Sequence, residues 1–254
     1  MESHQDNNLE RHSVLCEIIP TYNEAENIEV LISKLEAIRD KLPYELRILV
    51  VDDNSTDGTP DIVKKAMQTF GNIGILQRPF LAGIGSAYVD GFRHAIASYN
   101  ADYLGEIDAD LQHPPEVLIQ MCEVSKQEDV VVASRYVKGG GSANWSLTRR
   151  IVSKTANILT KIFLRIPVSD STSGFRVMSR KAVESLLSYE VSSKGYSFQV
   201  ESLYAYKKSG MTFAEVPYVF QIRQAGKTKL NWKEVVRFAG ITIKTGVFGL
   251  KKKA

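Results

Sequence analysis

The chain has 254 residues, of which 44% are hydrophobic and 24% are charged, with 17 Gly, 8 Pro and 2 Cys. These values are ordinary for a folded protein and exclude the collagen-like, disordered and disulfide-scaffold classes. The segment 1–12 has no apolar stretch, so we expect no secretory signal. The longest apolar run, 238–250, contains Lys244 and is too short to cross a bilayer, so no transmembrane helix is expected. We therefore expect a peripheral location on the cytoplasmic side of a membrane.

The formal net charge of +3 hides an uneven distribution of charges. Residues 204–254 carry 11 Lys and Arg against 2 Asp and Glu, whereas residues 1–203 carry 21 against 27. A basic C-terminal quarter suits nucleic acid, anionic lipid or phosphate ligands, or it is simply a solvated basic surface. Nucleic acid is the poorest of these interpretations, because the segment has no recognisable nucleic-acid motif and no interleaved aromatic residues.

Short apolar runs alternate with helical patterns through the first half of the chain. The runs rich in Val and Ile predict buried strands at 14–19, 46–51, 73–76, 103–107 and 130–133. Apolar residues at helical spacing predict helices at 25–42, 59–70, 86–99 and 115–125. This alternation is typical of βαβ units, so we expect an α/β fold with a mostly parallel sheet covered by helices. Ligands of such sheets bind beyond the carboxyl ends of the strands.

Polar clusters follow three of the predicted strands, at 20–24, 52–57 and 108–112. If the chain stays extended after the fourth strand, the side chains of Asp108, Asp110 and Gln112 point to one side and can converge on a cation. Oxygen ligands of this kind suit Mg²⁺ or Mn²⁺, with substrate phosphate completing the coordination. The alternative is a helix cap, because prolines that announce a helix follow directly. An EF-hand is excluded, since its loop requires Gly where this chain has His113.

Other catalytic motifs are weak or missing in the sequence. Gly83 and Gly85 precede a helix, but Tyr88 replaces the third glycine of a dinucleotide-binding fingerprint, so we interpret them as turn glycines. No GxxxxGK[ST] motif occurs, which excludes a P-loop. The absence of a GxSxG motif and of a plausible Cys/His pair leaves little support for nucleophilic hydrolysis.

Several weak motifs in a fixed order make a stronger signal than any one of them. The chain contains in order PTYNE, VVDDNSTDGT, GIGSAY, EIDADLQHPPE, ASRY, GGG, TRRIVSKTAN, SDSTSGFRVM, GYSFQVE and IRQAGKTKL. Together these resemble the dolichol-phosphate mannosyltransferases, within the inverting glycosyltransferases of family two. The resemblance runs from about residue 14 to residue 230 and implies a single nucleotide-sugar-binding domain of GT-A fold over 13–230. A flexible N-terminal tail, 1–12, is expected before it.

The resemblance also implies roles for particular residues. The nucleoside pocket is expected at Pro20, Tyr22, Glu24, Val51 and Asp53, although Asp53 is alternatively a turn residue. The metal and diphosphate site is expected at Asp108, Asp110 and Gln112, with the backbone around Ala109 close to the donor. Arg135, Arg223 and Lys229 match positions that hold phosphates, and the catalytic roles fall to Asp110, Arg223 and Lys229. The acceptor phosphate is expected at Arg149 and Ser153, four residues apart on a helix, unless these belong to an exposed basic face with Arg150 and Lys154.

The implied reaction moves mannose from GDP-mannose to dolichyl or polyprenyl phosphate with inversion at the anomeric carbon. A phosphate monoester has a second pKa of about 6, so it arrives largely ionised and needs no dedicated general base. Two alternatives stay open. A UDP-sugar polyprenyl-phosphate transferase, such as a glucosyltransferase, shares most of the motifs, and a catalytically silent nucleotide-sugar or membrane-surface binding subunit is the other.

The C-terminal segment 231–254 has a pattern of its own. Apolar residues at helical spacing alternate with basic ones, and Lys251, Lys252 and Lys253 follow. This pattern predicts a basic amphipathic helix in peripheral contact with an anionic membrane surface. The alternatives are a terminal helix that covers the sheet, and anchoring by a separate membrane-spanning subunit.

Overall fold

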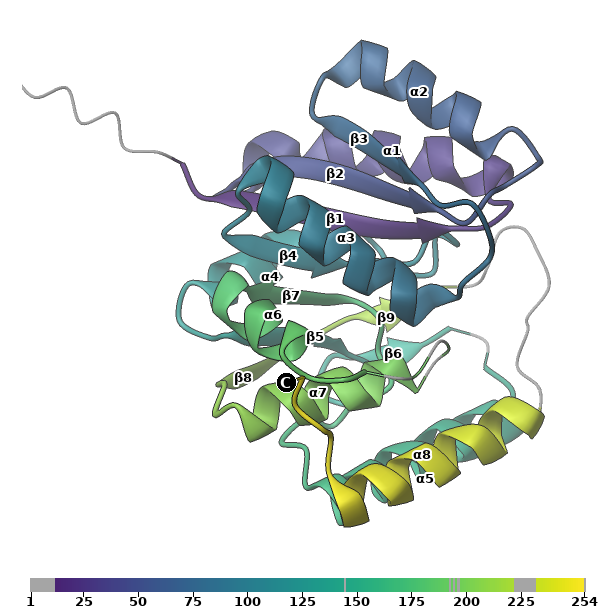
Figure 1. Cartoon of the computed structure of the whole chain (residues 1–254), viewed down its shortest axis with the longest axis vertical. Coiled ribbons are helices and arrows are strands. Elements are labelled where there is room, and N and C mark those ends of the chain that lie inside the picture. The colour runs from purple at the N-terminus through teal and green to yellow at the C-terminus, as the bar shows by residue number, and fades with distance from the viewer. Residues whose placement is uncertain are drawn as a thin grey trace, which may run out of the picture.

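The structure is a computed structural model that describes residues 12–143, 145–191, 193, 195, 197–221 and 232–253. The described residues form a seven-stranded sheet of order β3-β2-β1-β4-β7-β5-β8, with helices on both faces (Figure 1). Its strands are β1 (Val14–Thr21), β2 (Glu45–Asp52), β3 (Ile73–Gln77), β4 (Tyr103–Glu106), β5 (Val130–Ser134), β7 (Arg176–Ser179) and β8 (Phe213–Pro217). β6 (Gly141–Ser142) and β9 (Val219–Phe220) form a separate small parallel sheet.

The helices agree with the predicted pattern in the first half of the chain. They are α1 (Ala25–Ile38), α2 (Thr59–Phe70), α3 (Ile84–Tyr99), α4 (Val117–Ser125), α5 (Leu147–Leu164), α6 (Arg180–Leu187), α7 (Phe198–Lys208) and α8 (Trp232–Phe248). The helix predicted over 25–42 is shorter as an α-helix, because it ends at Ile38 and continues as a 3₁₀ turn over Arg39–Lys41.

Both faces of the sheet are buried. Along β1, Cys16 and Ile18 pack into one core cluster with α3, while Leu15 and Ile19 pack into the other with α1 and α4. Strands buried on both faces have continuous apolar runs, which is why the sequence marked them clearly. All neighbouring strands that pair are parallel except β7, which is antiparallel to both β4 and β5.

Parallel pairing brings the predicted polar clusters to one edge of the sheet. Thr21 and Asp52 are register partners at the ends of β1 and β2, and the Thr21 hydroxyl donates to Asp52 Oδ1 at 2.9 Å. β4 pairs with β1 in the same direction and ends at Glu106. The segments that follow these strands therefore start from a common edge, as the sequence predicted.

The C-terminal segment is helical over Trp232–Phe248, and Lys251–Lys253 follow the helix, as predicted. α8 packs along α5, and Figure 1 shows the two helices side by side beyond the β8 side of the sheet. After Gly249 the chain turns back, and Lys251 O accepts from Glu190 N at 2.9 Å while Lys253 N donates to Ser188 O at 2.8 Å. Backbone pairing holds Lys251–Lys253 against residues 188–190, and their side chains are exposed, so the membrane contact predicted for this segment stays a prediction. Among the described residues no helix combines the length and apolar character that a membrane span requires.

Candidate active site

A cavity of about 180 Å³ opens at the carboxyl-end edge of the sheet and reaches to α5 and α8. Six of the predicted site residues line it, namely Asp108, Asp110, Gln112, Arg135, Arg149 and Ser153. Apolar side chains line another part of it, namely Ile84, Val152, Ala156, Val235 and Phe238. The fold thus brings the predicted metal residues and the predicted acceptor residues into one cavity, with an apolar wall beside them.

The two carboxylates of the DxDxQ motif reach this cavity by a route that differs from the predicted one. The segment is not extended, because Leu111 has a φ of 62° and Asp110 Oδ1 accepts from the backbone N–H of Gln112 at 3.1 Å. The extended conformation predicted for this segment is therefore wrong, and a tight turn places both carboxylates instead. The helix-cap alternative also fails, since α4 begins at Val117 with no side-chain cap bond.

Asp108 is held by two aromatic side chains. Tyr88 donates from its hydroxyl to Asp108 Oδ1 at 3.3 Å, and His113 Nε2 lies 3.5 Å from Oδ2. Burial and then the negative charge of Asp108 raise the pKa of Tyr88 well above its usual range, so the phenol keeps the proton that it donates. These contacts orient the Asp108 carboxylate while 28% of its side chain stays exposed to the cavity.

The donor set at Asp108 and Asp110 fits Mg²⁺ or Mn²⁺. The described residues contain no group of three or more His, Cys, Asp or Glu that could hold a metal. Two carboxylates are nevertheless enough for Mg²⁺, because its sites commonly combine one or two carboxylates with substrate phosphates and water. Gln112 also has a structural function, because its Nε2 donates to Gln221 O at 3.0 Å and its own carbonyl accepts from Gln221 N at 2.9 Å. Only the side-chain oxygen of Gln112 is suited to a cation.

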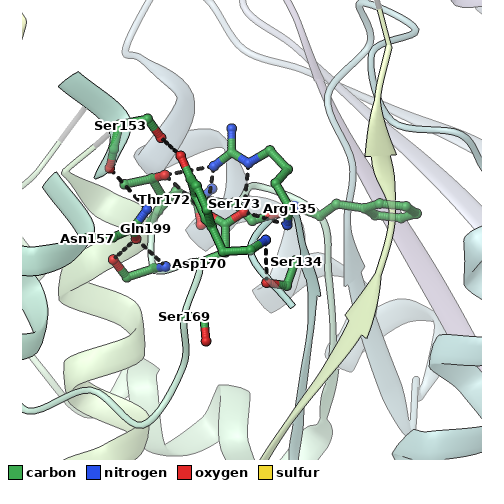
Figure 2. A network of polar contacts seen from close by, with 12 residues as sticks. Ser134, Arg135, Ser153, Asn157, Ser169, Asp170, Thr172, Ser173 and Gln199 are labelled. Atoms are coloured by element: carbon green, nitrogen blue, oxygen red, sulfur yellow. Dashed lines mark hydrogen bonds and ion pairs between the residues drawn. The ribbon is translucent and has the colours of Figure 1, made fainter. Parts of the chain in front are cut away.

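Arg135, at the end of β5, is fixed by a buried carboxylate (Figure 2). Its Nε and Nη2 each donate to Asp170 at 2.6 Å, and Nη2 also donates to Thr172 Oγ1 at 2.8 Å. Burial alone would raise the pKa of Asp170, but the Arg135 guanidinium outweighs it and holds that pKa below the usual range. Asp170 is therefore ionised, and Arg135 retains Nη1 for a ligand in the cavity.

The loop that contains Asp170 is tied to two distant elements. Glu215 on β8 accepts from the backbone N–H groups of Ser169 and Asp170 at 2.8 and 3.1 Å. Asn157 on α5 accepts from the Ser171 N–H at 2.8 Å and donates to Ser153 O at 3.1 Å. The loop thus links the end of the sheet to the helix that carries the predicted acceptor residues (Figure 2).

Arg149 and Ser153 share one face of α5 and line the cavity, as the four-residue spacing predicted. The side chain of Ser146 caps this helix and accepts from the Arg149 N–H at 3.3 Å. Ser153 Oγ accepts from the Tyr136 hydroxyl at 2.7 Å. The neighbouring Arg150 is exposed and does not line the cavity, so only part of the basic helix face belongs to the site.

The residues predicted to bind the nucleoside differ in how far their side chains are exposed. Tyr22, which follows β1, is 40% exposed and presents an aromatic face, and Pro20 and Glu24 next to it are partly buried. The Val51 side chain is fully buried in the core, so a nucleoside can meet only its backbone. Asp53 is 4% exposed and both its oxygens are engaged, by Arg78 and by two backbone N–H groups. A direct contact of Asp53 with the nucleoside thus requires one of these bonds to open.

Residues 16–187 match the family model described as Glycosyl transferase family 2. The chain belongs to glycosyltransferase family 2. It is 35% identical over 214 residues to the undecaprenyl-phosphate mannosyltransferase of Micrococcus luteus, an alignment that covers 84% of this chain and 86% of the relative. It is 34% identical over 220 residues to the polyprenol monophosphomannose synthase of Mycolicibacterium smegmatis, covering 86% and 81%.

Solved structures agree with the fold of this glycosyltransferase. Glucosyl-3-phosphoglycerate synthase from Mycobacterium tuberculosis, in complex with Mn²⁺, UDP and glucosyl-3-phosphoglycerate, is similar with a TM-score of 0.65 and 17% identity, covering 93% of this chain and 78% of that one. Mannosyl-3-phosphoglycerate synthase from Rubrobacter xylanophilus gives 0.66 and 19%, covering 92% and 73%. The expected single α/β domain of GT-A fold is confirmed.

Some site residues of this glycosyltransferase were missed from the sequence, and others lie outside the described residues. Asp170 and His113 were not assigned roles, although Asp170 holds Arg135 and His113 contacts Asp108. An acidic residue inside the SDSTSG motif was the available signal for Asp170. Arg223 and Lys229 fall in the part of the chain that is not described, so their phosphate and catalytic roles stay predictions. Ala109 is 4% exposed, and only its backbone can face a donor.

Proposed function

We propose that this family 2 glycosyltransferase transfers mannose from GDP-mannose to a dolichyl or other polyprenyl phosphate, with inversion. The observation that carries the proposal is the single cavity in which two carboxylates, two arginines and an apolar wall meet. Two relatives at about one-third identity are named for mannose transfer to undecaprenyl phosphate and for polyprenol monophosphomannose synthesis, which supports mannose and a polyprenyl acceptor.

The donor half of the proposed site lies at the strand ends. Asp108 and Asp110 would hold Mg²⁺ or Mn²⁺, which supplies neutralisation of the departing diphosphate when bound. Tyr22 offers an aromatic face for the base, and Glu24 offers a carboxylate for the ribose. Arg223 and Lys229 are predicted to add positive charge at the diphosphate.

The acceptor half lies on α5 and α8. Arg149, Ser153 and Arg135 Nη1 face the space next to the carboxylates and would bind the acceptor phosphate. The apolar wall from Val235 and Phe238 would receive the first isoprene unit. Because the acceptor arrives largely ionised, positioning and charge stabilisation suffice, and we assign no general base.

A membrane surface is the natural source of such an acceptor. The paired helices expose large apolar side chains, namely Leu147, Ile151, Ile158, Ile162 and Phe163 on α5 and Val236, Ile243, Val247 and Phe248 on α8. Exposed Lys154, Lys161 and Lys244 lie among them. We propose peripheral binding to an anionic membrane through both helices, a larger surface than the single helix predicted from the sequence.

Co-sedimentation with anionic liposomes tests the membrane contact. Replacing Val236, Val247 and Phe248 with Ser removes exposed apolar groups and leaves the α5–α8 packing in place, so pelleting is expected to fall at both low and high salt. The matched control replaces exposed Val30 and Phe80 with Ser on other parts of the surface. Equal pelleting of both variants would exclude these three α8 side chains as the membrane contact.

A donor and acceptor panel tests the reaction. Radiolabelled GDP-mannose is incubated with a short polyprenyl phosphate, Mg²⁺ and the enzyme, with UDP-glucose in a parallel reaction. We expect a mannosyl lipid of inverted anomeric configuration, read by NMR of the product. Transfer from UDP-glucose alone would select the UDP-sugar alternative, and binding of either donor without turnover would select the silent binding subunit.

A further inference from the structure

Trp145 contacts both arginines of the cavity. The guanidinium carbon of Arg149 lies 4.4 Å from the centre of the Trp145 ring, and that of Arg135 lies 5.0 Å from it. Both distances are within the range of cation–π attraction. Trp145 is itself part of the cavity wall and is only partly buried. One aromatic ring therefore contacts two guanidinium groups that come from different elements, the end of β5 and the first turn of α5.

Phe220 supports the same arrangement from β9. Its ring centre lies 5.5 Å from the guanidinium carbons of both arginines, and it meets the Trp145 ring edge to face at 5.5 Å. The small β6–β9 sheet fixes this geometry, because the backbone N–H of Ala143 donates to Phe220 O at 2.9 Å just before Trp145. The short sheet therefore holds Phe220, and the chain just before Trp145, beside the two arginines.

We propose that Trp145 is a positioning residue for the acceptor phosphate, an inference that rests on the proposed polyprenyl-phosphate acceptor. Two guanidinium groups repel each other, and each is drawn to the same ring, so the ring holds them near one another before the ligand arrives. Because Asp170 already fixes Arg135, the ring mainly orders Arg149, and a phosphate group can then bind both arginines without first paying the entropy of ordering the Arg149 side chain. Trp145 acts through Arg135 and Arg149 and need not touch the reacting atoms.

Two variants of Trp145 test whether the residue affects the KM for the acceptor and not the KM for the donor. Trp145→Leu removes the aromatic ring and keeps an apolar side chain, whereas Trp145→Phe keeps a ring. We expect the KM for a short polyprenyl phosphate in detergent to rise about tenfold in W145L, with little change in the KM for the donor sugar nucleotide or in kcat. W145F is expected to recover most of the loss. Phe70→Leu, which removes an aromatic ring at the end of α2, is the matched control and is expected to match the wild type.

A double-mutant cycle distinguishes positioning from general packing. If Trp145 works by holding Arg149, the effect of W145L on the acceptor KM is expected to shrink in an Arg149→Ala background. Full additivity, or an equal rise in donor and acceptor KM, would overturn the proposal. A wild-type enzyme that does not use polyprenyl phosphate would instead overturn the proposed function. Thermal midpoints measured in parallel identify a W145L protein that has lost its fold, and in that case W145F alone carries the test.

Discussion

Replacing Asp170 with Asn removes the negative charge under Arg135 at almost constant volume. The carboxylate is 0% exposed and accepts three bonds from Arg135, from Nε, Nη2 and the backbone N–H. The Asn side chain keeps one acceptor oxygen and turns an NH₂ group toward the guanidinium. Breaking one side of a buried ion pair costs about 3–5 kcal/mol, so a loss of that order in unfolding free energy is expected.

The pH dependence of this loss follows from the pKa of Asp170. That pKa is lowered in the folded protein, so the carboxylate stabilises the fold fully above its unfolded value of about 3.9. The stabilisation is lost as the pH falls through the lower folded value. The wild type and D170N are therefore expected to differ most near neutral pH and to converge in acid.

Urea denaturation of both proteins measures the stability change, and acceptor kinetics measure the functional one. Since Arg135 loses its anchor, the KM for polyprenyl phosphate is expected to rise about tenfold, in line with the strength of a charged hydrogen bond. The matched control is Asp61→Asn, whose ion pair with Lys64 is exposed and is expected to contribute about 0–1 kcal/mol. Equal stability losses in D170N and D61N would show that burial does not make the Arg135–Asp170 pair stronger than an exposed pair.

Three further predictions address the cation, the acceptor and the core. Asp110→Ala, or treatment of the wild type with EDTA, is expected to lower turnover by orders of magnitude without unfolding the protein. Mg²⁺ or Mn²⁺ is expected to restore the activity of the EDTA-treated enzyme. Full activity in chelated buffer would show that the reaction needs no cation. Arg149→Ala is expected to weaken polyprenyl-phosphate binding by about tenfold or more while GDP affinity, measured by calorimetry, stays nearly unchanged. Glu17 is fully buried, and burial followed by the negative charge of Glu106 raises its pKa. The wild type therefore has its full stability below about pH 4.3, where Glu17 is neutral, and loses stability as the pH rises. Glu17→Gln is expected to gain stability over the wild type from about pH 5 to about pH 8, and a stability difference that is equal at the two pH values in urea denaturation would contradict this.

Some elements could be predicted accurately because local chemistry determines them. α2 begins and ends at the predicted residues, since Pro60 fits its first turn and Gly71 accepts the left-handed conformation at its end. β7 could not be predicted from its pattern, because it is four residues long and contains the buried charge of Arg176. That charge is stabilised by Ser202, by backbone carbonyls and by Glu106 at 3.9 Å, all of which depend on tertiary structure.

The same contrast holds for the candidate site. The position of Asp108 and Asp110 in the cavity was predictable because parallel strands end at one edge, even though the extended geometry assumed for them was wrong. The partner of Arg135 was not predictable, since Asp170 lies 35 residues away and reaches it through a loop anchored on α5 and β8. Contacts between a strand end and a remote loop leave no periodic signal in a sequence.

The charges around the cavity predict that its proposed donor and acceptor halves depend on each other. Among the described residues, Asp108, Asp110, Arg135 and Arg149 line the cavity, and Asp170 binds Arg135 from behind. The carboxylates of this group therefore outnumber its arginines. A phosphate monoester carries about −1.5 to −2 near neutral pH and would be repelled by this surplus of negative charge. A divalent cation at Asp108 and Asp110, or the predicted Arg223 and Lys229, reverses the balance. If the proposed function is right, we therefore expect the acceptor phosphate to depend on Arg149, on Arg135 Nη1 and on the groups that compensate the donor-side carboxylates, so that acceptor affinity rises when the donor site is loaded.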